Sequence, residues 1–268
     1  NGSTVCIEPG NYSTNLIING SNITLNQICK GQVNVPQVGF YGSGQVNNLQ
    51  LQANSSAGTW GAYSFNSSDI TIQNGDINSS GISLSSSSMK VAGNVSSSGP
   101  IYLTQSFMSA GGDINGTVAN VSDPFTQLNC TNAGVCIDNN STMTAGGNIT
   151  CSGFTCGISP NDNSTMTAGG NIISYGWGIG AGNHSTMTAG GNIIAADWQT
   201  NMGATNSTIE ACGNIVDNGW FRDLRGSSAF IMRAQIFCFG TWPCYYPTTN
   251  LGYNNSWLYP PPSFCTGQ

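Results

Sequence analysis

The feature that most constrains the fold is a repeated decapeptide in the second half of the chain. Copies reading NSTMTAGGNI end at Ile149 and Ile172, HSTMTAGGNI ends at Ile193, and the variant NSTIEACGNI ends at Ile215. Successive copies are thus 23, 21 and 22 residues apart. A period of this length predicts stacked supersecondary units, each needing its neighbours to bury its apolar side. Weaker copies end upstream, at Ile77, Val95 and Ile114.

Within each copy, apolar residues alternate with threonine, as in Thr142-Met143-Thr144-Ala145. Strict alternation predicts a β-strand with one buried face. The Gly-Gly pair that follows each strand excludes a helical repeat. We therefore predict an all-β fold, a parallel β-helix of about 18–23 residues per coil over residues 1–216. The expected inward columns are Met143/Met166/Met187/Ile209, Ala145/Ala168/Ala189/Ala211 and Ile149/Ile172/Ile193/Ile215.

The N-terminus adds a family resemblance. The segment Val5-Cys6-Ile7-Glu8-Pro9-Gly10-Asn11-Tyr12, followed by Asn15-Leu16-Ile17-Ile18 and Ser21-Asn22-Ile23-Thr24-Leu25, resembles the opening coil of right-handed parallel β-helix proteins of the pectate-lyase and pectinesterase type. The likeness covers the first 25 residues and implies the same fold. It implies little about activity, because this architecture also serves binding and structural proteins.

The repeat fades after Ile215, and residues 217–268 are rich in aromatics, Pro and Cys. A solenoid end exposes both its core and its strand edges, so it needs a cap. We predict a disulfide-stapled C-terminal cap here. An assembly surface of exposed aromatics is a compatible alternative.

Two columns of asparagine accompany the repeat. Asn148, Asn171, Asn192 and Asn214 follow the glycines and predict a structural ladder of stacked amides. Asp76 and Asp113 occupy the same position upstream. The second column, Asn140, Asn163, Asn183 and Asn206, precedes the threonine strand, and each member begins an N-x-[Ser/Thr] sequon. Glycans there would stand about 4.8 Å apart, so either the sites splay apart or occupancy is partial.

Sequons are unusually frequent. We count 18, whereas the 33 Asn and 57 Ser plus Thr among 268 residues would give roughly 7 by chance. The excess predicts N-glycosylation, which would hydrate a surface poor in charge. The predicted glycosylation sites are Asn11, Asn19, Asn22, Asn54, Asn66, Asn78, Asn94, Asn115, Asn120, Asn129, Asn140, Asn148, Asn163, Asn183, Asn206 and Asn254.

The ten cysteines predict disulfides in an oxidising compartment, because their number is even and several lie in local pairs. No CxxC motif occurs and there is a single His, so we predict no metal site. The expected local pairs are Cys130–Cys136, Cys151–Cys156 and Cys238–Cys244, which leaves Cys6–Cys29 and Cys212–Cys265.

The composition restricts the kinds of partner that the chain is expected to bind. Charged residues make up 6% of the chain, against roughly 25% in an ordinary soluble domain. The chain contains only five Lys and Arg residues, and this low number argues against nucleic-acid binding, which needs clustered cations. No apolar run is long enough for a transmembrane helix. We expect a secreted, extracellular or cell-surface chain whose signal peptide has been removed.

Catalysis and ice binding are the weaker hypotheses. The acidic residues are scattered, Arg222, Arg225 and Arg233 lie outside the repeat, and no paired carboxylates occupy matching positions in neighbouring coils, as a glycosidase would need. His184 lies inside a sequon. The motifs Thr142-x-Thr144, Thr165-x-Thr167 and Thr186-x-Thr188 resemble the faces of β-solenoid antifreeze proteins, although threonine is also common on outward strand faces.

The remaining hypothesis is structural. We expect a subunit of an extracellular glycosylated filament or cell-surface layer that assembles with copies of itself, without catalytic residues or any cofactor beyond covalent N-linked glycans. The Asn, Ser, Thr and Tyr-rich composition resembles that of glycosylated appendage and surface proteins of archaea and some algae. The alternative is a monomeric cell-surface adhesin or carbohydrate-binding module.

Overall fold

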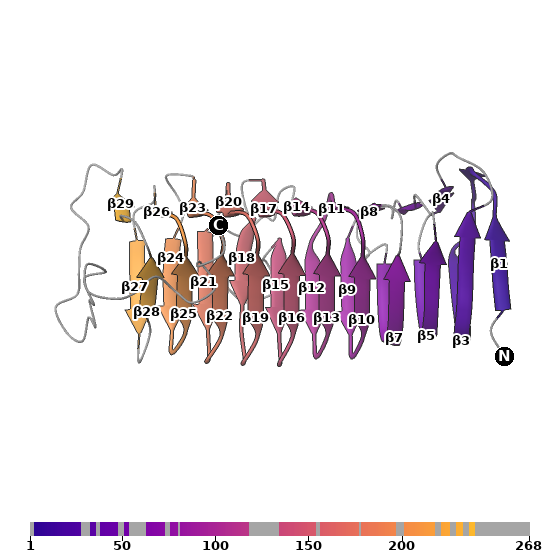
Figure 1. Cartoon of the computed structure of the whole chain (residues 1–268), viewed down its shortest axis with the longest axis horizontal. Helices are drawn as coiled ribbons and strands as arrows, with labels where there is room; N and C mark the ends of the chain where they lie inside the picture. Colours follow the sequence, from indigo (N-terminus) through magenta and orange to yellow (C-terminus); the bar gives the residue numbers. More distant parts are fainter. Residues whose placement is uncertain are drawn as a thin grey trace.

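The computed structural model describes residues 3–27, 33–35, 38–47, 51–53, 63–72, 76–79, 81–117, 134–153, 156–176, 178–196, 201–217, 221–225, 229–232 and 236–238. Within these residues the chain forms parallel β-strands and no helix. The strands stack side by side along one axis, from the indigo N-terminal coils to the orange C-terminal ones (Figure 1). The predicted parallel β-helix is confirmed.

From residue 82 onward each coil contains three short strands, one on each of three faces. Face 1 contains β9 (Ile82–Ser85), β12 (Ile101–Thr104), β15 (Val135–Asp138), β18 (Gly157–Pro160), β21 (Gly178–Gly182), β24 (Asn201–Thr205) and β27 (Phe221–Arg225). Face 2 contains β10 (Ser88–Val91), β13 (Phe107–Ala110), β16 (Thr142–Ala145), β19 (Thr165–Ala168), β22 (Thr186–Ala189), β25 (Thr208–Ala211) and β28 (Ala229–Met232).

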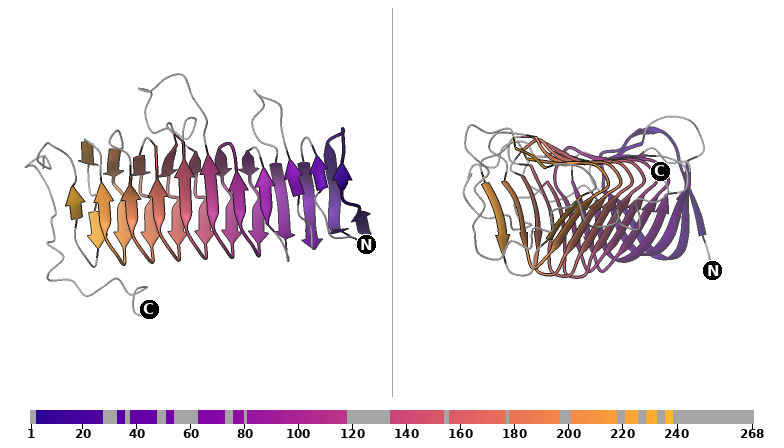
Figure 2. Two further views of the ribbon diagram at one scale, coloured as in Figure 1. Left: turned by 90° about the horizontal axis from the view of Figure 1, so that it is seen from above. Right: turned by 60° about the vertical axis from the view of Figure 1, so that its left-hand side comes forward.

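Face 3 is an 11-stranded sheet that runs the whole length of the solenoid. Figure 2 shows its short strands running beside those of the other two faces. Its members are β2 (Gly10–Asn11), β4 (Val33–Val35), β6 (Leu51–Ala53), β8 (Ile77–Ser79), β11 (Val95–Ser97), β14 (Ile114–Thr117), β17 (Ile149–Ser152), β20 (Ile172–Ser174), β23 (Ile193–Ala195), β26 (Ile215–Asp217) and β29 (Ile236–Cys238).

The N-terminal coils are simpler, because one long strand takes the place of faces 1 and 2. The strands β3 (Leu16–Gln27), β5 (Val38–Asn47) and β7 (Tyr63–Ile72) pair in parallel in that order, and β1 (Ser3–Ile7) pairs with β3. At the transition, the first part of β7 pairs with β9 and its last part with β10. The long strand therefore divides into two faces at this point.

The core consists of the predicted columns. Met143 pairs in register with Met166, and Met166 with Met187, and their side chains are fully buried. The alanine and isoleucine columns are also in register and buried. An identical residue in each coil places like side chains on top of one another, which buries a face that a single coil would leave exposed.

Parallel pairing continues beyond residue 216. Strand β27 pairs with β24, β28 with β25, and β29 with β26. The coil stack therefore extends into the segment predicted as a cap. Residues 239–268, which contain the rest of that segment, lie outside the described part of the chain.

Candidate functional site

The turn between faces 2 and 3, here called the glycine corner, contains the predicted ladder. The backbone N–H of Asn171 donates to Oδ1 of Asn148 at 2.8 Å, and that of Asn192 donates to Oδ1 of Asn171 at 2.7 Å. The Nδ2 groups of the same residues reach the same oxygens at 3.2 Å. Each coil thus satisfies a backbone donor of the next coil. The ladder runs through Asp76, Asn94, Asp113, Asn148, Asn171, Asn192 and Asn214.

Four ladder residues (Asp113, Asn148, Asn171 and Asn192) follow two glycines, and both glycines pack closely against the preceding coil. A Cβ on Gly170 would run into Oδ1 of Asn148, and a Cβ on Gly169 would run into the carbonyl oxygen of Gly146. The glycine corner therefore explains the whole AGGN motif as a structural element. Asp76 and Asp113 accept ladder hydrogen bonds, as predicted, because a carboxylate supplies the same acceptor oxygen.

The turn between faces 1 and 2, here called the serine corner, contains a second ladder that the sequence analysis did not anticipate. The backbone N–H of Ser141 donates to Oγ of Ser164, and that of Ser164 donates to Oγ of Ser185, both at 3.1 Å. Both serines are 1% exposed. The available signal was a serine at a constant position before the threonine strand. The ladder runs through Ser87, Ser106, Ser141, Ser164, Ser185 and Ser207.

The residues before these serines have positive φ, for example 61° at both Asn140 and Asn163. Asparagine tolerates this left-handed conformation better than most residues. The triplet Asn-Ser-Thr therefore has a structural explanation at each position: left-handed turn, buried ladder and outward strand residue. The fold alone therefore explains why these sequons recur, whether or not they carry glycans.

The predicted column of corner asparagines needs one correction. Asn140, Asn163 and Asn206 directly precede the ladder serines, but in the coil between the last two this place is taken by His184. Asn183 lies one residue earlier and donates from Nδ2 to Oδ1 of Asp162 at 2.7 Å. The decapeptide itself stays in register here, and it is the sequon that begins one residue earlier, as alignment of HSTMTAGGNI with NSTMTAGGNI also shows.

The other predicted glycosylation sites are distributed over the solenoid. Asn11, Asn78 and Asn115 are residues of face 3 strands, while Asn94 and Asn148 belong to the ladder. Asn19, Asn22 and Asn66 lie in the long strands β3 and β7. Glycosylation of these sites stays a prediction. Asn54, Asn120, Asn129 and Asn254 lie outside the described residues.

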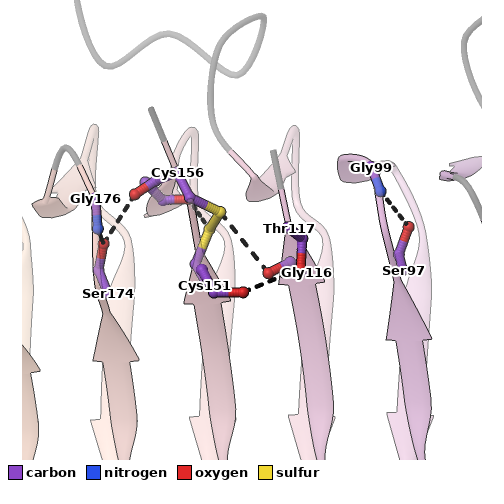
Figure 3. The surroundings of a disulfide bond; sticks show 10 residues. Ser97, Gly99, Gly116, Thr117, Cys151, Cys156, Ser174 and Gly176 are labelled. Carbon is purple, nitrogen blue, oxygen red and sulfur yellow. Dashed lines mark hydrogen bonds between the residues drawn. A yellow bond between two sulfur atoms is a disulfide. The ribbon is translucent and has the colours of Figure 1, made fainter. Parts of the chain in front are cut away.

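One predicted disulfide is confirmed. Cys151 and Cys156 are joined, with their Cα atoms 5.6 Å apart, and both side chains are fully buried (Figure 3). Sγ of Cys156 lies 3.8 Å from the carbonyl oxygen of Gly116 in the preceding coil, and Oγ of Ser174 in the next coil donates to the Cys156 carbonyl at 2.9 Å. The bridge thus packs between neighbouring coils.

The other cysteines divide into three groups. Cys136 and Cys212 are disulfide-bonded, in agreement with the prediction that they form bridges. Cys6 is an exposed free cysteine, so the expected Cys6–Cys29 bridge is not formed. The side chains of Cys29, Cys130, Cys238, Cys244 and Cys265 lie outside the described set, so the Cys130–Cys136, Cys212–Cys265 and Cys238–Cys244 pairings stay predictions.

Face 2 presents the threonine array. Thr142, Thr165, Thr186 and Thr208 are in register on consecutive strands, and a parallel row contains Thr144, Thr167 and Thr188. These side chains alternate with buried ones and so point outward. The second row ends at Glu210, where burial raises the pKa of the carboxyl. The array is therefore a nearly uncharged surface of hydroxyl and methyl groups.

The N-terminal coil presents exposed apolar side chains. Val5 on β1 is 45% exposed and Ile17 on β3 is 64% exposed, and Tyr12 lies between them in the chain at 40%. Strand β1 is hydrogen-bonded to β3 along one edge, and none of the described strands pairs with its other edge. This end thus combines an open strand edge with apolar surface.

Asp138 and Asp162 lie in neighbouring coils, one position out of register, and their carboxyl groups interact. Partial burial, together with the neighbouring Asp162, raises the pKa of Asp138, while the N–H of Asn139 opposes the shift. His184 is exposed at the serine corner. Across the described ranges, no cluster of three or more His, Cys, Asp or Glu is placed to hold a metal ion. Nor does that part of the chain contain a helix that could span a membrane.

Comparisons with known proteins found no matching family model, no matching curated protein and no matching solved structure. The resemblance of the first 25 residues to pectate-lyase-type proteins therefore rests on those motifs alone. The fold class, a parallel β-helix, is established by the strand pairing.

Proposed function

We propose that this chain is a structural subunit of an extracellular, glycosylated filament or cell-surface layer, and that it assembles by contacts with copies of itself. The observation that carries the proposal is the open N-terminal edge of the solenoid. Strand β1 has there an edge with which no other described strand pairs, and the same N-terminal coil exposes Val5, Tyr12 and Ile17. Open strand edges with apolar surface favour addition of another strand.

The geometry favours a copy of the same chain as the partner. All pairings among the described strands are parallel, so the first and the last described coils present opposite edges of the same sheets. The first coil of one copy therefore has the strand direction needed to continue the last coil of another. Such head-to-tail contacts propagate into filaments unless the ring closes.

Low charge supports the same conclusion. With Lys plus Arg at 5 and Asp plus Glu at 11 in 268 residues, little electrostatic repulsion opposes end-to-end contact. Glycans on the sides of the rod would supply hydration and discourage lateral clumping. The proposal requires neither a catalytic site nor a bound cofactor.

Electron microscopy tests assembly directly. Native material is expected to show filaments or sheets, and the double variant Val5→Lys/Ile17→Lys is expected to reduce assembly by at least tenfold, because charge at the open edge opposes docking. Tyr175→Lys is the matched control, since Tyr175 is an exposed aromatic (50%) on the side of the rod. Native micrographs containing only separate short rods would overturn the proposal, as would assembly unaffected by the double variant.

The threonine array supports a second candidate, a monomeric adhesin or carbohydrate-binding module. Two in-register rows of hydroxyl and methyl groups present a repeated pattern to which a regular polymer could bind. Ice binding would use the same face. A monomeric mass together with a glycan-array signal lost in Thr165→Lys would favour the module, whereas thermal hysteresis would favour ice binding.

A further inference from the structure

Three sequon asparagines far apart in the sequence share one column on face 3. Asn11 pairs with Asn34, which pairs with Gln52, and Gln52 pairs with Asn78. Strand β11 then links Asn78 to Asn115, because Ser96 pairs with both of them. Asn11, Asn78 and Asn115 therefore lie on one line along the solenoid.

The side chains in this column point away from the core. Asn78 is exposed between the buried residues Ile77 and Ser79, and Asn115 is half-buried between Ile114 and Gly116, which are buried. Asn11 is exposed on β2. A group attached to Nδ2 at these positions would extend from the sheet without entering the interior.

The spacing of the column suits bulky groups. Asn11 and Asn78 are three coils apart and Asn78 and Asn115 are two coils apart, which corresponds to roughly 14 Å and 10 Å at about 4.8 Å per strand. At the serine corner, by contrast, Asn140 and Asn163 are in consecutive coils. Glycans at that corner would compete for the same space, whereas those of the face 3 column would not.

The ladder asparagine Asn148 is a sequon residue in the opposite situation. Its Nδ2 donates to Oδ1 of Asp113 at 3.2 Å, and its Oδ1 accepts from both nitrogens of Asn171 at 2.8 and 3.2 Å. Both side-chain polar atoms thus hold neighbouring coils together. A sugar on Nδ2 would have to fit between closely packed coils, where even a Cβ on Gly170 is not accommodated.

We propose that Asn11, Asn78 and Asn115 carry N-linked glycans that form one row on face 3, and that Asn148 remains unmodified. The modification requires an oligosaccharide donor activated as a lipid-linked phosphate ester. The amide Nδ2 forms a bond to C1 of the sugar and loses one proton, while the C1–O bond to the phosphate breaks and the lipid phosphate leaves with the electron pair.

The row is confined to the N-terminal half of the face. Beyond Asn115 the same column continues with Thr150, Ile173, Ile194 and Val216, none of which is an asparagine. The proposed row of glycans on face 3 therefore ends where the column becomes apolar. This inference rests on the glycosylation in the proposed function, but not on filament assembly.

Glycopeptide mass spectrometry of protein purified from its native source tests the proposal. More than half of the molecules are expected to carry a glycan at each of Asn11, Asn78 and Asn115, and fewer than one in twenty at Asn148. Occupancy below half at any of the three, or above one in twenty at Asn148, overturns the proposal. Protein without glycans overturns it as well, while electron microscopy decides the assembly question separately.

Substitutions provide an independent readout. Asn78→Gln and Asn115→Gln should each lower the intact mass by one glycan and leave the melting temperature of enzymatically deglycosylated protein within about 2 °C, because these side chains point outward. Asn148→Gln is the matched control and should leave the glycan mass unchanged while lowering that temperature. An unchanged mass in the first two variants contradicts the proposed row.

Discussion

The two ladder corners of the solenoid perform the same task with different chemistry. At the glycine corner, a side-chain amide or carboxylate oxygen accepts the backbone N–H of the next coil. At the serine corner the direction is reversed, because a buried hydroxyl accepts the backbone N–H of the preceding coil. Where two glycines precede the ladder residue, as in the coils of Asn148, Asn171 and Asn192, the glycine corner fixes three consecutive residues, because both glycines pack against the preceding coil.

The serine corner constrains less. Only the serine is buried, and the residue before it varies among Ser86, Gln105, Asn140, Asn163, His184 and Asn206, all with positive φ. The comparison teaches that the same residue type has different roles at the two corners. Asparagine is a coil-to-coil connector at the glycine corner and a turn residue open to solvent or modification at the serine corner.

The largest expected effect is steric and belongs to the glycine corner. Gly169→Ala would place a Cβ against the backbone of Gly146, which can move only if the coils separate. We expect a loss of about 3 kcal/mol, or a fall in melting temperature of about 6–12 °C in circular dichroism. Gly10→Ala is the control, because its Cβ would meet only Tyr12, at 3.8 Å. Equal melting temperatures would contradict close coil packing.

Removal of a ladder side chain should have the next largest effect. Asn171→Ala leaves the backbone N–H of Asn192 without its acceptor and is expected to cost about 2 kcal/mol, measured by thermal melting. Asn171→Asp keeps the acceptor oxygen, as Asp113 does naturally, and should lose less than half as much. A similar loss in both variants would show that the acceptor oxygen is not what matters.

At the serine corner, removal of a ladder side chain should destabilise the protein less. Ser164→Ala leaves the N–H of Ser141 unpaired in a buried position, for an expected cost of about 1.5 kcal/mol in the same melting experiment. Ser109→Ala, on an outward position of β13, should change stability by less than about 0.5 kcal/mol. Equal melting temperatures for Ser164→Ala and Ser109→Ala would contradict a stabilising role of the serine ladder.

The turn residue before the serine should matter less again. Asn163 has a φ of 61°, so Asn163→Ala is expected to cost about 1 kcal/mol in the melting experiment on unglycosylated protein. Asn163→Gly removes the same sequon but suits the left-handed turn, and should not lower stability. If Asn163→Gly loses as much stability as Asn163→Ala, the loss would point instead to a side-chain interaction of Asn163.

The smallest expected effect depends on pH. Burial and Asp162 raise the pKa of Asp138, so the folded state binds this proton more tightly than the unfolded chain does. The resulting stabilisation is present in full below the ordinary Asp pKa of about 3.9 and is lost as pH rises through the higher folded value.

Asp138→Asn removes this titration. The melting temperature of the variant should fall less than that of the native protein between pH 4 and pH 7. Glu8→Gln, at an exposed N-terminal position, serves as the charge control. If the melting temperature of the native protein instead rises relative to that of Asp138→Asn between pH 4 and pH 7, the pKa of Asp138 is lowered and not raised by folding.

Much of the fold could be predicted from residues that repeat at a constant period. The Met, Ala and Ile columns, the Asn–Asp ladder and the Cys151–Cys156 bridge follow from local spacing, and the structure confirms each of them. The serine ladder was missed because serine occurs in many other places in this chain. Asn183 was placed in the wrong column because its sequon begins one residue earlier than in the other copies, whereas the aligned decapeptide places His184 there.

The sequence by itself determined that coils stack, since the period, the strand alternation and the glycine pairs allow no other way to bury the apolar side chains. Only the tertiary structure placed Asn11 in the same column as Asn78 and Asn115. Residues 11, 78 and 115 share a line on face 3 because the strands pair in register, although coil lengths differ and no constant period in the chain connects these residues. The neighbours of a residue in adjacent coils are set by the hydrogen-bond register between strands. Stacking of the core side chains fixes this register, and the distance between residues along the sequence does not.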